Sequence, residues 1–224
     1  MKLLLSCLIL VLAASFAQAL PNPDMLLCDY FGYDYTAPIP RDFTAPGQIY
    51  TALGDVDNVN PDALITDPLN NEYTFVMNSG TLTAADTIAG IFARYDYNAG
   101  DGTFHIYEDP IAAGTHRDYG VDPPNLEAPA TFEDGTLILG GTFTALSIIV
   151  NLSNSTASLN GTITFYCGDG WGDLPCYEGW TFAGETQEAG IPGGYIWAVD
   201  GLVYVEETVS TENTSWGSIK SLFQ

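Results

Sequence analysis

Residues 91–107 read IFARYDYNAGDGTFHIY, a pattern that is typical of two β-strands flanking a turn. In the second strand-like run, the apolar residues Phe104 and Ile106 alternate with a histidine and a tyrosine. Such an alternation places apolar side chains on one face of a strand and polar ones on the other. The intervening stretch NAGDG consists of residue types that favour turns. We therefore predict a β-hairpin here.

Comparable signals recur along the rest of the chain. Runs rich in aromatic and β-branched residues occupy residues 73–77, 136–139, 142–152, 162–166, 195–199 and 202–205. Turn signals containing glycine follow or separate these runs at Asn78-Ser79-Gly80, Gly140-Gly141 and Asp200-Gly201. Many short strands divided by such turns predict an all-β fold, a β-sandwich or jelly roll built from antiparallel sheets.

The first residues of the chain predict export. Lys2 precedes an apolar run, and an A-x-A cleavage signal follows at residues 17–19, so residues 1–19 have the pattern of a signal peptide. A lipidation motif ending at Cys7 is a competing interpretation, but Cys7 lies too close to Lys2 to leave an apolar run before it. We expect a secreted protein, located outside the cell or at its surface.

Beyond the signal peptide we expect three parts. Residues 20–67 are rich in proline and show little clean alternation, which predicts an extended or irregular N-terminal arm. Residues 68–210 contain most of the strand signals and are predicted to form the β-sandwich domain. Residues 211–224 form a tail in which apolar residues recur at helical spacing, so we expect a short C-terminal helix there.

The charge of the chain is strongly acidic. The chain contains 28 acidic and 5 basic residues among 224, with a formal net charge of −23. Such a chain repels phosphate backbones, so we expect no nucleic-acid partner. No later segment has the roughly 20 apolar residues that a membrane-spanning helix needs, so we expect no membrane span. Two interpretations of the acids remain open, since they suit divalent cations or cationic surfaces and also simply keep a protein soluble.

The cysteines predict one disulfide. Cys167 and Cys176 flank a loop rich in glycine that ends in a proline, and an exported protein meets an oxidising environment. Neither a C-x-x-C motif nor the histidine-containing spacing of a zinc site is present. We therefore expect Cys167 and Cys176 to close the loop between them. Cys28 is left over, either as a free thiol or as an intermolecular thiol that bridges to another molecule.

Oxygen-rich segments raise the question of calcium. Two sets of side chains are candidate ligands: Asp96, Asn98, Asp101 and Glu108, or Asp55, Asp57, Asn60 and Asp62. Both depart from the spacing of an EF-hand loop. The alternative interpretation is that these Asp and Asn residues serve only ordinary turns, in which both residue types are common.

Aromatic residues around the cysteine loop suggest sugar binding. Trp171, Tyr177 and Trp180 lie in or beside that loop, and aromatic faces on a rigid β scaffold suit stacking on pyranose rings. The alternative is that these rings fill the core or cover the disulfide.

No catalytic constellation stands out, so we do not predict an enzyme. A glycan hydrolase would need two carboxylates facing each other across a cleft, and the spacing selects no pair among the candidates Glu108, Asp109, Glu127, Glu133, Asp134, Glu178 and Glu185. The two histidines, His105 and His116, are too few for a histidine-rich metal centre. No G-x-S-x-G motif is present.

Two regions resemble known sequences. GTFHIYEDP (102–110), DYGVDPPN (118–125) and FEDGTLILGGTF (132–143) resemble a group of uncharacterised secreted bacterial β-rich proteins, and the tail TSWGSIKSLF (214–223) is similar to the C-terminal ends of other exported bacterial proteins. The resemblance implies a bacterial envelope or extracellular setting and brings no activity with it. In a eukaryotic secretory protein, four sequons would instead carry glycans, at Asn151, Asn154, Asn160 and Asn213.

These observations favour a secreted structural or surface-interaction protein without catalytic activity. It would self-associate through its N-terminal arm or through exposed sheet edges, as in assembly or adhesion. The alternative is an extracellular carbohydrate-binding module with a polysaccharide partner. A third hypothesis is a glycan hydrolase whose carboxylate pair the sequence does not reveal.

Overall fold

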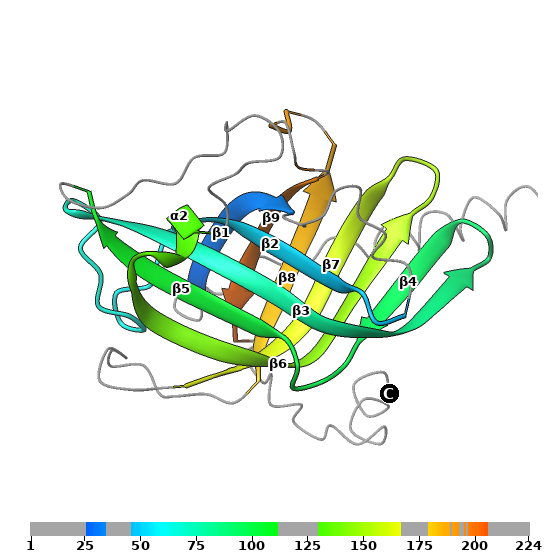
Figure 1. Ribbon diagram of the computed structural model, residues 1–224, viewed down its shortest axis with the longest axis horizontal. Coiled ribbons are helices and arrows are strands. Elements are labelled where there is room, and N and C mark those ends of the chain that lie inside the picture. Colours follow the sequence, from blue (N-terminus) through cyan, green and yellow to red (C-terminus); the bar gives the residue numbers. More distant parts are fainter. Residues whose placement is uncertain are drawn as a thin grey trace, which may run out of the picture.

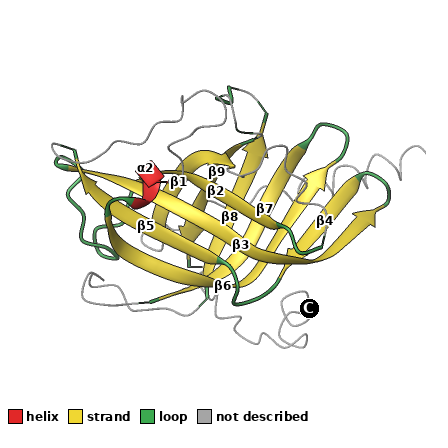
Figure 2. Ribbon diagram, viewed as in Figure 1, coloured by secondary structure: helices red, strands yellow, loops and turns green. Residues whose placement is uncertain are grey.

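The computed structural model describes residues 26–34, 46–111, 130–166, 179–188, 190–192, 195 and 197–205. Within them almost all regular structure is β-strand, and a single short helix, α2 (Ala130–Glu133), is present (Figure 2). The all-β prediction is confirmed. The strands are β1 (Leu26–Asp34), β2 (Ile49–Asp57), β3 (Asn71–Ile88), β4 (Phe92–Tyr97), β5 (Thr103–Pro110), β6 (Thr136–Asn151), β7 (Thr156–Phe165), β8 (Trp180–Gln187) and β9 (Ala198–Tyr204).

The strands form one antiparallel sheet that closes on itself (Figure 1). Around the ring the order is β2, β1, β9, β8, β7 and β6, followed by β4 and β5, and then β3. β3 pairs with β2 from Asp55↔Thr74 to Ile49↔Thr81, and this pairing closes the sheet. The predicted sandwich of two facing sheets is therefore wrong, because strands that would be sheet edges in a sandwich are joined to each other.

The hairpin predicted at residues 91–107 is also wrong. β4 and β5 do not pair with each other. They follow one another end to end, and each is hydrogen-bonded to β3 on one side and to β6 on the other. β3 has 18 residues and β6 has 16, so each is long enough to flank both. The stretch NAGDG is a local excursion, held to the flanking strands by Asn98 N–H to Thr81 O (2.8 Å) and Gly100 N–H to Phe143 O (2.8 Å).

Three other predicted turns lie inside strands. The glycine signals at 78–80, 140–141 and 200–201 fall within β3, β6 and β9. Gly201 shows the reason, because a Cβ atom there would lie 2.2 Å from the carbonyl oxygen of Ala183 and 2.3 Å from the hydroxyl of Tyr30. The Tyr30 hydroxyl donates a hydrogen bond to that same carbonyl at 3.1 Å. A glycine within a strand thus marks the close approach of another group as readily as it marks a turn.

Aromatic side chains fill the interior of the closed sheet. Tyr30 of β1 stacks on Phe182 of β8 with ring centroids 4.9 Å apart, and Phe75 of β3 stacks on Phe104 of β5 at 5.4 Å. An edge-to-face contact between Tyr30 and Phe75, at 5.2 Å, joins the two pairs. None of the four rings is more than 1% exposed. The core of the fold therefore occupies the space in which a wider closed sheet would hold a ligand.

The segment predicted as an arm contributes to the ring. Within residues 20–67, β1 and β2 are each paired on both sides. Residues 46–48 and 58–67 of the arm are described as loops, whereas residues 20–25 and 35–45 lie outside the described residues, as do the predicted signal peptide and the predicted C-terminal helix. In the described part of the chain, no helix has the length and apolar character needed to cross a membrane.

Candidate functional site

The outer face of the closed sheet includes two regions of different charge, and β3, β4 and β5 complete the ring between β6 and β2. β1, β2, β8 and β9 form the acidic half, which has carboxylates among its outward-facing or exposed side chains, namely Asp29, Asp55, Asp57, Glu185 and Asp200. β6 and β7 form the uncharged half, because residues 136–166 contain no Asp, Glu, Lys or Arg. Because aromatic rings fill the interior, the candidate sites lie on this outer surface.

In the acidic half, carboxylates face each other across neighbouring strands. Asp29 of β1 lies opposite Asp57 of β2, and Glu185 of β8 lies opposite Asp200 of β9. The amide of Asn58 donates a hydrogen bond of 2.6 Å to Asp29. Like charges directly opposite one another destabilise a sheet. Among the described residues, no group of three or more His, Cys, Asp or Glu side chains is placed to hold a metal ion.

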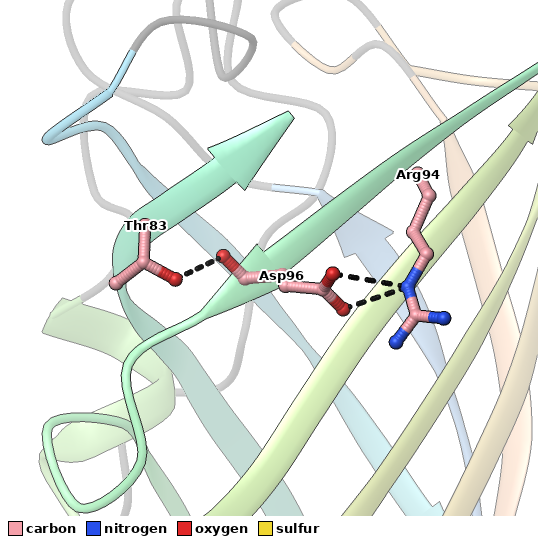
Figure 3. Close-up of polar contacts among 3 residues, drawn as sticks. All are labelled: Thr83, Arg94 and Asp96. Atoms are coloured by element: carbon pink, nitrogen blue, oxygen red, sulfur yellow. Dashed lines mark hydrogen bonds and ion pairs between the residues drawn. The ribbon is translucent and has the colours of Figure 1, made fainter. Parts of the chain in front are cut away.

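The structure does not bring the first predicted calcium set together. Asp96 on the outer face of β4 accepts bonds from Nε of Arg94 at 2.9 and 3.0 Å, and its carbonyl accepts one from Thr83 (Figure 3). Asn98 and Asp101 bond to each other within the NAGDG excursion. Glu108 lies near the far end of β5.

Glu108 belongs to a separate polar cluster. One of its carboxylate oxygens accepts hydrogen bonds from the hydroxyl of Tyr73 at 2.6 Å and from the amide of Asn71 at 2.8 Å. The Tyr73 hydroxyl also accepts a bond from the backbone N–H of Asp67 at 2.6 Å. Burial, followed by the bond to Glu108, raises the pKa of Tyr73. These contacts fasten the loop between β2 and β3 to the end of β5.

The second predicted calcium set has structural roles in the described chain. Asp55 and Asp57 lie on β2, whereas Asn60 lies in the loop that follows. The Asn60 amide donates to the carbonyl of Leu26 at 3.0 Å, and its side-chain oxygen accepts a bond from Asp62 N–H at 2.9 Å. Asn60 therefore ties the loop to β1.

Cys28 lies in the interior and is 0% exposed. Burial, with a smaller contribution from Asp29, raises the pKa of its thiol, which disfavours the reactive thiolate. A bridge from Cys28 to another molecule would require β1 to open. The predicted disulfide between Cys167 and Cys176 lies outside the described residues.

The predicted sugar-stacking residues are only partly described. Trp180 is 0% exposed and meets Phe165 edge to face at 6.2 Å, so its ring belongs to the core. Trp171 and Tyr177 lie outside the described residues.

Of the residues considered for catalysis, His116, Glu127 and Glu178 also lie outside the described residues. The described ones are spread over the sheet and α2. Burial raises the pKa of Glu133 in α2, whereas Glu185 faces outward on β8.

One feature that sequence reasoning missed is a pair of projecting hairpins. Figure 1 shows the turn between β3 and β4 and the turn between β6 and β7 at the same end of the sheet, and Leu152 N–H joins them by bonding to Ile91 O at 2.9 Å. Four apolar side chains are exposed here: Ile88 (48%), Ile91 (52%), Phe92 (37%) and Leu152 (51%). We call these four residues the tip patch.

Beside the tip patch, one edge of β3 has no strand partner among the described residues. Its pairing with β2 ends at Thr81, whereas its pairing with β4 continues to Ile88. Residues 83–88 therefore have a strand partner on one side only within the described chain. Their backbone groups on the other side form the kind of edge to which a further strand can add.

A second feature that sequence reasoning missed is an aromatic row on the outer face. His105 of β5 lies opposite Gly140 of β6, and the backbone N–H of Tyr166, just beyond β7, bonds to Gly140 O at 2.8 Å. A Cβ atom on Gly140 would lie 3.3 Å from the Tyr166 ring and 3.4 Å from the His105 ring, so the two rings flank the glycine. The Tyr107 hydroxyl lies 3.5 Å from Nδ1 of His105.

Comparison with protein-family models, with curated proteins and with solved structures finds no match to the chain. The function is therefore inferred from the sequence and the geometry of the chain itself. Two features of the described chain are open to a partner, namely the β3 edge with its tip patch and the aromatic row.

Proposed function

We propose that this is a secreted structural or surface-interaction protein that acts by assembly, without catalytic activity, and that a second copy of the chain adds to the open edge of β3. The predicted signal peptide supports the exported location. The observation that carries the assembly proposal is the strand edge at residues 83–88, which has a described partner on one side only.

The sequence of this edge is self-complementary. In a two-fold antiparallel pair centred on Ala85, Thr83 lies opposite Thr87 of the other copy, and Ala84 lies opposite Asp86. No two carboxylates would face each other, in contrast to the cross-strand pairs of the acidic half. Residues 85–88 are exposed, so little rearrangement is needed before a strand can dock.

The charge around the edge also favours contact between copies. Arg94 is the only Lys or Arg among the described residues, and it lies on β4 directly opposite Asp86 while bonding Asp96. The neighbouring hairpin between β6 and β7 carries no charge. Two copies of a strongly acidic protein repel each other least where their surfaces are closest to neutral.

The tip patch adds apolar area to the contact. Ile88 pairs with Phe92 across the β3–β4 hairpin, so these side chains lie at the end of the edge that the second copy would cover. A pairing of five residues, 83–87, with a small apolar patch is a small interface, which makes the association weak and dependent on concentration.

Sedimentation velocity of residues 20–224 over a range of protein concentrations tests the proposal. We expect reversible self-association in the wild type, and its loss in Thr87→Asp, which adds a charge to the edge. Asn160→Asp is the matched control, because it adds the same charge at an exposed position of β7 that is paired on both sides. The control should associate as the wild type does.

Two results would contradict the proposal. One is a wild-type chain that stays monomeric at all concentrations, and the other is an equal effect of Thr87→Asp and Asn160→Asp. Because Cys28 is buried, we also expect reductant to leave the association unchanged. Dissociation by reductant would place the contact at a cysteine rather than at the β3 edge.

A further inference from the structure

The aromatic row lies beside a row of neutral polar side chains. Asn78 of β3, Thr103 of β5, Thr142 of β6 and Thr164 of β7 are consecutive cross-strand partners, and each is partly exposed. His105, Gly140 and Tyr166 of the aromatic row, together with Val76 of β3, form a second row parallel to the first. Each of these residues lies two positions further along its strand. Side chains two residues apart on a strand point to the same face, about 7 Å from one another. The two rows therefore form one surface with apolar rings on one side and hydroxyl and amide groups on the other.

Tyr166 is the most exposed ring of this surface, at 64%. Its hydroxyl is bonded to Oγ1 of Thr142, and its backbone is bonded to Gly140. These two contacts fix the orientation of the ring without covering it. Gly140 is buried between the Tyr166 and His105 rings, so the absence of a side chain there lets the two rings lie close together.

We infer that this surface is a binding site for a neutral oligosaccharide, with one pyranose ring stacked on Tyr166 beside Thr164 and hydroxyl groups of further rings bonded to Thr103 and Asn78. Aromatic faces present apolar area with a polar handle, which matches a sugar ring with its axial C–H groups and its equatorial hydroxyls. Thr and Asn side chains supply both donors and acceptors.

The charge distribution selects a neutral ligand over a charged one. β6 and β7 carry no charged residue, so the surface offers no ion pair to a phosphate, a sulfate or an acidic sugar. The negative charge of the rest of the chain repels those anions further. The site is independent of the β3 edge, since residues 83–88 lie outside both rows. It also differs from the predicted Trp171, Tyr177 and Trp180 platform.

Affinity electrophoresis in native gels tests the inference, with residues 20–224 and gels that contain dextran, hydroxyethylcellulose, galactomannan or starch as neutral probes. We expect at least one of these to retard the wild type and Tyr166→Ala to lose at least ten-fold in affinity, with Tyr166→Phe in between because it keeps the ring and loses the bond to Thr142. Thr164→Val should weaken binding by several-fold, because it replaces a hydroxyl with a methyl group of similar size.

Phe31→Ala is the control, since Phe31 is an aromatic residue on the acidic half that is 37% exposed. It should bind as the wild type does. The inference is overturned if no neutral probe retards the wild type, if only anionic alginate does so, or if Tyr166→Ala and Phe31→Ala have the same effect. Thr87→Asp should retain sugar binding, so failure of the assembly proposal and failure of the carbohydrate site give different results.

Discussion

The acidic half and the uncharged half of the sheet share one buried core and differ in the charge of their outer faces. Phe182 beneath the acidic half and Phe143 beneath the uncharged half are both fully buried and touch edge to face, with centroids 5.2 Å apart. Outside, carboxylates crowd one half, whereas Ser, Thr and Asn cover the other. Because one core lies beneath both outer faces, the outer charges do not specify the fold. They keep one half solvated and leave the other able to make contacts.

The largest effect should come from the shared interior. We expect Phe182→Ala and Phe143→Ala each to lower the free energy of unfolding by about 3–5 kcal/mol, because each removes a fully buried ring and leaves a cavity. Urea denaturation of both variants measures the effect. If Phe143→Ala cost less than about 1 kcal/mol while Phe182→Ala cost several, the two halves would not share a core.

A smaller effect should follow when the close approach at Gly201 is disturbed. A Cβ atom at Gly201 would overlap the Ala183 carbonyl and the Tyr30 hydroxyl, whereas the nearest atom to a Cβ at Gly161 in the uncharged half is 2.9 Å away. We expect Gly201→Ala to cost about 1–3 kcal/mol, and Gly161→Ala to cost less. Thermal unfolding of the two variants makes the comparison. An equal or reversed order would show that the Tyr30 packing does not require the glycine.

The facing carboxylates of the acidic half should be a source of instability. Asp200→Asn removes one charge opposite Glu185 and should stabilise the fold by about 0.2–1 kcal/mol at low ionic strength. The gain should shrink in 1 M salt, where screening is strong. Urea denaturation at the two salt concentrations gives the answer. A loss of stability at low salt would mean that the pair is favourable, for example through a bound cation.

The smallest effect should be the pH response of His105 on the outer face of β5. Burial lowers its pKa in the folded state, so the folded protein favours the neutral ring. The rings of Tyr107 and Tyr166 lie beside this ring. The stabilisation that the neutral His105 ring provides is therefore complete above the ordinary histidine pKa of about 6.5. It is lost as the pH falls through the lower pKa of the folded state.

Denaturation of the wild type and of His105→Gln between pH 7.5 and pH 5 isolates this contribution. The difference between the two should change in that window, with the wild type losing more stability on acidification. Parallel pH profiles would show that His105 is as solvated in the folded state as in the unfolded state.

The alternation of side chains was readable from the sequence, and the closure of the sheet was not. Phe104 and Ile106 point inward, as their spacing predicts. A sandwich and a closed sheet bury the same alternate residues, so this pattern cannot tell them apart. The β2–β3 pairing decides between them, and no local sequence pattern predicts that pairing. The glycine signals were misleading for a related reason. In the sequence Gly201 indicates a turn, whereas in the structure it leaves room for the hydroxyl of Tyr30.

The candidate sites were predictable only in part. The absence of charge across residues 136–166 is visible in the sequence and marks the uncharged half. The aromatic row was not visible, because His105 and Tyr166 are 61 positions apart in the chain and meet only through pairing with Gly140. The open edge depends on where β2 stops along β3, which is a matter of register rather than composition.

Amide hydrogen exchange measured at several protein concentrations tests the central claim most directly. If β2 closes the ring against β3 and leaves residues 83–88 open, the amides of residues 49–55 that point toward β3 should exchange slowly at every concentration. Amides of residues 83–88 that point away from β4 should exchange fast in dilute solution and slow down as copies associate. Exchange of those β2 amides as fast as at a free edge, at every concentration, would contradict the closed sheet and favour separate sheets instead.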